Sequence, residues 1–180
     1  MLDRNGFWKL IEHTRHRDTE QQYLNIRGSL TPLSAEDVCL FWQYASLYVE
    51  HSESPATYIA CKLLNGCASD DTELYFRCWL VAQGKEVFFG TLKDIDHLSD
   101  LDLPGPPYEF EMLMGAVVSV LEEKAGDIES VMEKYTMPSA EAAEIEMEIE
   151  TNREWGEDED DLWDQASVRA PKLWSKYNGV

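Results

Sequence analysis

Hydrophobic residues recur every three or four positions through most of this chain, the spacing that aligns side chains on one face of an α-helix. The segment after Ser34 shows the spacing most clearly, with apolar side chains at Val38, Phe41, Trp42, Ala45, Tyr48 and Val49. Ser34 is a favourable N-cap for this helix, and the residues from Ser52 to Pro55 end it. Weaker runs with the same spacing predict a first helix capped by Asn5, a second from Gln21 to Leu30, and further helices over Pro55–Leu64, Val87–Lys93 and Phe110–Leu121 and after Asp127. The pattern therefore predicts an all-α fold.

The segment from Ser69 to Gly84 predicts a helix that is apolar on almost every side. Its apolar side chains surround most of the helix axis, at Leu74, Tyr75, Phe76, Cys78, Trp79, Leu80, Val81 and Ala82. A helix of this kind is buried, so we expect a single compact multi-helix domain around a buried central helix at about residues 70–83. Only a narrow polar stripe remains, with Asp70, Glu73 and Arg77. Glu73 and Arg77 are four positions apart, in the favourable order for an ion pair.

One domain is expected to span residues 1–180. The Pro/Gly loop at residues 103–107 separates two helical halves of that domain. It is not expected to link two separate domains, because the second half alone has few core residues. Residues 141–150 alternate Glu with Ile or Met, the period of a strand, although Ala, Glu and Met prefer helices. Helix is favoured there, and a strand is the alternative. An acidic stretch at 141–161 precedes a tail whose aromatic rings are expected to dock on the body.

The charge of the chain limits its partners. Its formal net charge is −20, from 35 Asp and Glu against 15 Lys and Arg. Such a chain lacks the cationic surface that nucleic-acid phosphates need, and an anionic membrane surface would repel it. No apolar run approaches the length of a membrane span and no signal peptide opens the sequence, so a cytoplasmic protein with four reduced Cys is expected. The partners that this charge allows are basic proteins, cations and neutral small molecules.

Candidate chemistry is sparse. The acidic run at 157–161 lacks the pattern of a calcium loop, and no further ligands accompany His13 and His16, so no metal site is predicted. Cys67 precedes a helix N-terminus, but the neighbouring Asp70 and Asp71 disfavour its thiolate. The sequence contains no phosphate-binding loop, no dinucleotide fingerprint and no G-x-S-x-G motif, so neither a cofactor nor a catalytic residue is assigned.

The polar stripe on the central helix has two interpretations. The favoured one is a semi-buried ion-pair network that joins this helix to its neighbours, because charges in a core need partners. The other is a small polar pocket for a ligand or partner. The candidate residues of that pocket are Asn65, Asp70, Asp71, Glu73, Arg77 and Gln83.

Five segments of the chain resemble a bacterial family of single-domain cytosolic proteins whose function is unknown. They are Phe7–Glu12 (FWKLIE), Asn65–Asp71 (NGCASDD), Tyr75–Phe88 (YFRCWLVAQGKEVF), Trp155–Leu162 (WGEDEDDL) and Pro171–Trp174 (PKLW). The family pattern has a second Gly where this chain has Cys67. The resemblance implies a bacterial source and a mostly helical single domain, and it brings no activity with it.

Two functions are compatible with these features. The favoured one is a non-enzymatic binding protein, of regulatory or immunity type, that contacts a basic partner; the charge and the acidic stretch at 141–161 motivate it. The alternative is an enzyme or small-ligand binder with a polar pocket around Asp71, Arg77 and Gln83. The alternative requires these three side chains to meet in one concave site. No oligomeric state is predicted.

Overall fold

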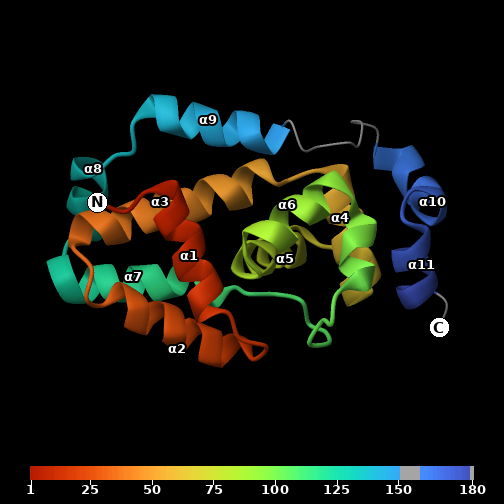
Figure 1. Cartoon of the computed structure of the whole chain (residues 1–180), viewed down its shortest axis with the longest axis horizontal. Helices are drawn as coiled ribbons and strands as arrows, with labels where there is room; N and C mark the ends of the chain where they lie inside the picture. Colours follow the sequence, from red (N-terminus) through yellow and green to blue (C-terminus); the bar gives the residue numbers. More distant parts are fainter. Residues whose placement is uncertain (151–158, 179–180) are drawn as a thin grey trace.

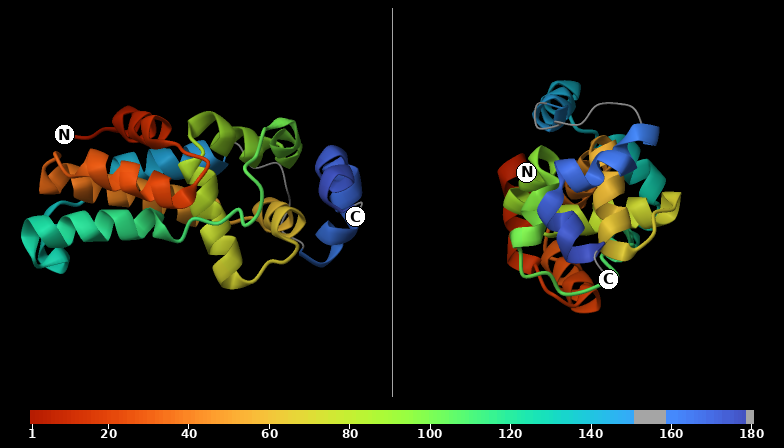
Figure 2. Two further views of the ribbon diagram at one scale, coloured as in Figure 1. Left: turned by 90° about the horizontal axis from the view of Figure 1, so that it is seen from below. Right: turned by 90° about the vertical axis from the view of Figure 1, so that its right-hand side faces the viewer.

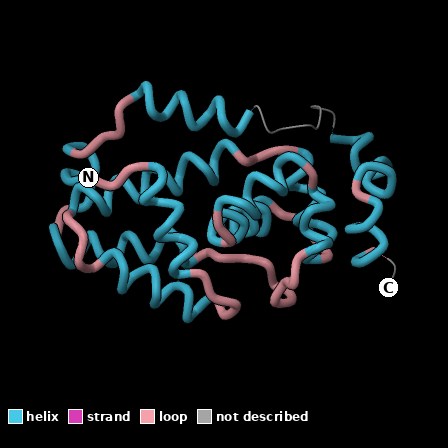
Figure 3. Tube along the Cα trace, viewed as in Figure 1, coloured by secondary structure: helices cyan, strands magenta, loops and turns pink. Residues whose placement is uncertain are grey.

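The structure of the protein is a computed structural model that describes residues 1–150 and 159–178. These residues form helices and no strand, so the predicted all-α fold is confirmed (Figure 3). In chain order, the helices of the described residues are α1 (Arg4–Thr14), α2 (Thr19–Leu30), α3 (Ala35–His51), α4 (Pro55–Asn65), α5 (Asp70–Ala82), α6 (Lys85–Lys93), the 3-10 helix η1 (Ile95–Asp100), α7 (Met112–Ala125), α8 (Ile128–Lys134), α9 (Ser139–Glu150), α10 (Glu159–Arg169) and α11 (Pro171–Tyr177).

Helix α5 lies at the centre of the molecule, as predicted, and appears end-on in the middle of Figure 1. It contacts α1, α3, α4, α6 and α7. Every residue from Phe76 to Ala82 is buried, because its neighbours cover it on all sides. Ser69 caps its start by accepting a hydrogen bond from the backbone N–H of Thr72, as the sequence predicts. Gly84, with φ of 97°, takes the left-handed turn that joins α5 to α6.

The long helices form the body of the molecule. Helix α3 packs against α7 on one side and α9 on the other, and α2 packs against α7. Figure 2 shows these helices running along the long axis. Helix α1 crosses them and is held by its rings: the centroids of Phe7 and Trp8 lie 5.5 and 4.6 Å from that of Tyr48 on α3. This aromatic cluster ties the N-terminus to the core.

Two helix starts differ from the prediction. Asp3, not Asn5, caps α1: its carboxylate accepts a hydrogen bond from the backbone N–H of Gly6 at 2.7 Å. Asp18 caps α2 by accepting from Gln21 at 2.8 Å, so this helix begins at Thr19 and not at Gln21. In both cases an Asp, which is a good N-cap, lies upstream of the predicted start and lets the helix begin earlier.

The described C-terminal helices α9, α10 and α11 dock on the body, as predicted for the aromatic tail. Residues 139–150 form helix α9, which settles the choice between helix and strand. Helices α10 and α11 pack against α4, and α11 also packs against η1, at the end of the molecule opposite the N-terminus (Figure 1). The rings of Trp163 and Trp174 lie 5.3 Å apart. Of the acidic run, residues 157 and 158 lie outside the described part, and Glu159 begins α10.

Candidate functional site

Arg77 is the best-anchored of the six predicted site residues. It is 6% exposed, and its Nη1 donates a hydrogen bond to the backbone carbonyl of Val49 at 2.8 Å. Its Nη2 lies 3.2 Å from a carboxylate oxygen of Glu53, and its Nε lies 3.7 Å from Glu73. The predicted Glu73–Arg77 pair is therefore present. The guanidinium joins α5 to the C-terminal end of α3 and to the connection that follows it.

The other predicted residues lie in three different places. Asp70 and Asp71 are exposed in the first turn of α5, where they complement the helix dipole. The side-chain carbonyl of Asn65 accepts a hydrogen bond from the backbone N–H of Tyr108 at 2.8 Å, which attaches the long connection before α7 to α4. Gln83 is buried at the far end of α5, and its Nε2 donates to the carbonyl of Trp79 at 3.4 Å.

Arg77 borders a hollow that we name the α3–α5 groove. Its volume is about 430 Å³, within the range of ligand-binding clefts. It is lined by Ser46, Val49, Glu50, Glu53, Leu74, Tyr75, Arg77, Cys78, Glu111 and Met114. Most of this lining is apolar, and Leu74 on α5 is 39% exposed. An exposed Leu beside an apolar hollow gives a partner a surface to bury.

The rim of the α3–α5 groove is acidic. Glu50, Glu53 and Glu111 line it, and Asp71 lies one helical turn before Tyr75. The Tyr75 hydroxyl donates a hydrogen bond to Glu111 at 3.3 Å. The nearby Glu111 carboxylate, and more weakly Asp71, raise the pKa of Tyr75 above its ordinary value. The positive charge of Arg77 is already paired with Glu53 and Glu73. The acidic rim therefore favours a ligand or partner that places a cationic group next to an apolar one.

The acidic residues of α9 are engaged within the fold. Glu144 and Glu148 pair with Arg4 at 3.0 and 3.2 Å, and Glu148 also pairs with Lys85 at 3.3 Å. Elsewhere on the helix, Glu146 lies 3.3 Å from a ring nitrogen of His51, and Glu141 accepts a hydrogen bond from Tyr44. The helical part of the acidic stretch therefore serves to attach α9, and its carboxylates are less available to a partner than the sequence suggests.

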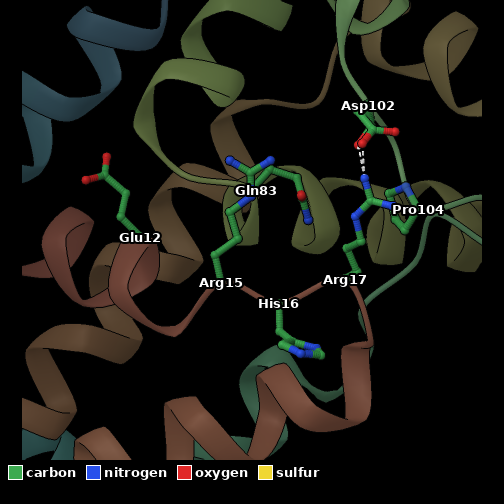
Figure 4. Close-up of a pocket in the computed structure, with 7 residues that line it drawn as sticks. All are labelled: Glu12, Arg15, His16, Arg17, Gln83, Asp102 and Pro104. Carbon is green, nitrogen blue, oxygen red and sulfur yellow. Dashed lines mark hydrogen bonds and ion pairs between the residues drawn. The ribbon is translucent and has the colours of Figure 1, made fainter.

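A second hollow, which we name the α1–α2 hollow, lies at the other end of α5. Its volume is about 620 Å³, and it is lined by Glu12, Arg15, His16, Arg17, Gln83, Asp102 and Pro104 (Figure 4). Gln83 thus belongs to this hollow, whereas Arg77 belongs to the α3–α5 groove. The structure does not bring Asp71, Arg77 and Gln83 together into one site.

Arg15 and Arg17 were not predicted as site residues, and His16 was considered only as a metal ligand. A signal for them exists, because four of the five residues from His13 to Arg17 are His or Arg in a chain of net charge −20. A basic run in an acidic chain is a better indicator of this hollow than the His spacing.

Within the described residues, no group of three or more His, Cys, Asp or Glu side chains is arranged to hold a metal ion. None of the helices in residues 1–150 and 159–178 combines the length and apolar composition that crossing a membrane requires. Cys39, Cys61 and Cys78 are buried free thiols and Cys67 is an exposed one. Burial raises the pKa of Cys61 to about 12 and that of Cys78 to about 11, which keeps these two thiols protonated.

A family model described as "Protein of unknown function (DUF4240)" matches residues 2–123. The match extends from the start of α1 into the last turn of α7, and it contains the lining residues of both hollows. Helices α8 to α11 lie outside it. Neither the curated proteins nor the solved structures contain a significant match to this chain.

Proposed function

The chain belongs to the DUF4240 family of proteins of unknown function, and we propose that it is a non-enzymatic binding protein whose α3–α5 groove takes a basic partner protein. The observation that carries this proposal is the composition of the groove, an apolar lining beneath a rim of Glu50, Glu53 and Glu111. A Lys or Arg next to an aliphatic or aromatic side chain is complementary to both parts. We further propose a bacterial, cytoplasmic protein of regulatory or immunity type.

The state of Arg77 supports binding in preference to catalysis. Its guanidinium is committed to Val49, Glu53 and Glu73, so it acts as an internal support of the groove wall and not as a group that waits for a substrate. The exposed carboxylate of Glu50 stands at the rim, and its position suits an incoming cation. Charged groups at such a rim set specificity and the rate of association, whereas the buried apolar contact supplies most of the affinity.

A small-ligand binder is the alternative, and the volume of the same groove favours it. A hollow of about 430 Å³ can enclose a compact molecule. Of the three residues first expected around such a ligand, Arg77 lines the groove and Asp71 lies near its rim, while Gln83 lies in the α1–α2 hollow. The ligand that fits would be apolar with one cationic group.

A photo-crosslinking amino acid at position 74, in cells of the native host, tests the proposal. Position 24 is the matched control, because Leu24 is also a Leu within a helix, α2, and its side chain is 50% exposed. We expect position 74 to capture a protein with an excess of Lys and Arg, and position 24 not to capture it. Capture of the same proteins from both positions, or of none from position 74, would contradict the proposal. Co-purification of a small molecule in place of a protein would favour the alternative.

A further inference from the structure

The connection between α1 and α2 is held in place at both ends. The carbonyl of Thr14 accepts a hydrogen bond from the Asn25 side chain at 3.3 Å. The backbone N–H of Asp18 donates to Nδ1 of His16 at 3.1 Å, while the Asp18 carboxylate caps α2. Residues 15–17 therefore project from a fixed backbone, and all three contribute side chains to the α1–α2 hollow.

The two arginines of this connection differ in their partners. Arg17 forms an ion pair with Asp102, drawn as a dashed line in Figure 4. Within the part of the chain that the structure describes, the guanidinium of Arg15 has no hydrogen bond or ion pair, although the chain contains 35 Asp and Glu. In Figure 4 the Arg15 guanidinium extends into the hollow on the side of Gln83, and His16 points the other way.

Gln83 forms the buried wall of the hollow. It is 6% exposed, and one side-chain N–H is engaged with the carbonyl of Trp79 at 3.4 Å. The end of α5 is fixed from behind by Gln22, whose side chain donates to the carbonyl of Ala82 at 2.8 Å. A primary amide has a second N–H, which remains for a group in the hollow.

From this geometry we infer that the α1–α2 hollow is a binding site for a small oxyanion, a carboxylate or a phosphate, held by the Arg15 guanidinium with the amide of Gln83 beside it. A guanidinium offers paired N–H groups that match two oxygens of such an anion. The site is separate from the α3–α5 groove, so this inference does not depend on the proposed partner.

Glu12 sets the strength of the site. It lines the same hollow, and its Cγ lies 3.2 Å from where a Cβ on Gly84 would be, so its aliphatic part rests on the turn after α5. Its negatively charged carboxylate repels an anion bound in the same hollow. Removal of that charge by Glu12→Gln should therefore tighten binding, whereas removal of the cation by Arg15→Gln should weaken it.

Titration of the ¹⁵N-labelled full chain with inorganic phosphate, with acetate and with chloride at constant ionic strength tests the inference. We expect phosphate or acetate to shift the Gln83 side-chain amide and the backbone amides of residues 15–18, with millimolar affinity, and chloride to leave them unchanged. Tighter binding of phosphate than of acetate would identify a phosphate ligand, and the reverse order a carboxylate.

Three variants make the result specific. Arg15→Gln should weaken phosphate or acetate binding about tenfold, the loss of one charge-assisted interaction. Lys9→Gln removes the same charge from an exposed position elsewhere on α1 and should change affinity less than about twofold. Glu12→Gln should tighten binding about twofold or more. The inference is overturned if neither oxyanion shifts these amides, or if Arg15→Gln and Lys9→Gln have equal effects.

Discussion

Arg77 is a charged side chain buried in the core. A guanidinium that is 6% exposed is stable only because Val49, Glu53 and Glu73 compensate its lost hydration. We predict that Arg77→Met lowers the free energy of unfolding by about 3 kcal/mol. The substitution removes the cation and leaves its former partners without their pairing in a partly buried environment. Urea denaturation at neutral pH measures the change.

Arg27→Met is the control for that experiment. Arg27 also pairs with a Glu, Glu123, but its side chain is 38% exposed. Exposed pairs contribute about 0–1 kcal/mol, so this variant should remain close to the native protein. Equal losses for the two variants would mean that Arg77 does not support the fold in the way its contacts indicate.

The buried thiols and Tyr48 make the fold sensitive to alkali. Burial raises the pKa of Cys78 from 9.0 to about 11, that of Cys61 from 9.0 to about 12, and that of Tyr48 from 10.0 to about 12. The unfolded chain loses these protons first, so the stabilisation is complete below pH 9 and is lost as the pH rises through the folded values. We predict that the urea midpoint falls steadily above about pH 9. A Cys78→Ala variant should show a shallower fall between about pH 9 and 11, and a midpoint independent of pH in both proteins would contradict the prediction.

At residue scale, helix geometry already limits which candidate residues can meet. Asp71, Arg77 and Gln83 follow one another at six-residue intervals, which places successive members about 120° apart around a helix. The structure accordingly puts Arg77 and Gln83 in different hollows. The Glu73–Arg77 pair was predictable because its spacing is local. The contact of Arg77 with Glu53 was not, since it depends on how α5 packs against α3 and the connection that follows α3.

At the scale of elements, the clearest helix starts are those in which a cap residue and the hydrophobic period agree, as at Ser34 and Ser69. The starts of α1 and α2 lie upstream of the predicted positions because Asp3 and Asp18 cap these helices. In α9 the alternation of the sequence was misleading: Ile145 and Ile149, four apart, are buried, whereas Met147 between them is 63% exposed. That is the period of a helix.

Helix α11 has a cap that comes from another element. The Asp96 carboxylate, on η1, accepts hydrogen bonds from the backbone N–H groups of Lys172 and Leu173 at 3.2 and 2.9 Å. An anion at a helix N-terminus satisfies orphan donors and complements the dipole. We predict that Asp96→Ala removes about 1–2 kcal/mol from this contact and speeds hydrogen exchange at the amides of residues 172 and 173.

Asp127→Ala is the matched control, because Asp127 is also an N-cap but caps α8, the helix that directly follows it in the chain. Helix α8 lies at the other end of the molecule from α11. It should leave exchange in α11 unchanged. If Asp96→Ala also left α11 unchanged, the docking of the C-terminal helices would rest on their apolar contacts alone, including buried Leu173 and the Trp163–Trp174 pair.

At the scale of the whole molecule, net charge says little about where the charges are available. The sequence places many acids in the stretch at 141–161, yet α9 uses its carboxylates to pair with Arg4, His51 and Lys85. These pairs join residues that are far apart in the chain, so no local pattern could predict them. The groove is likewise assembled from α3, α5 and the start of α7, which only the packing brings together. The proposed interface therefore moves from the acidic stretch to the rim of the α3–α5 groove.

The central claim is that this rim selects a basic partner, and a charge reversal tests it most directly. Glu50 and Glu122 are both exposed Glu in the last turn of a helix, but only Glu50 lines the groove. A Lys in a last turn suits the helix dipole, so neither Glu50→Lys nor Glu122→Lys should destabilise the fold.

The measurement is the affinity of the protein crosslinked from position 74 for the native chain and for these two variants. Glu50→Lys should weaken binding about tenfold or more, with the loss reduced at high salt, whereas Glu122→Lys should stay within about threefold. Equal affinities of all three proteins, or equal losses in both variants, would show that overall charge and not the groove determines binding, and would contradict the account.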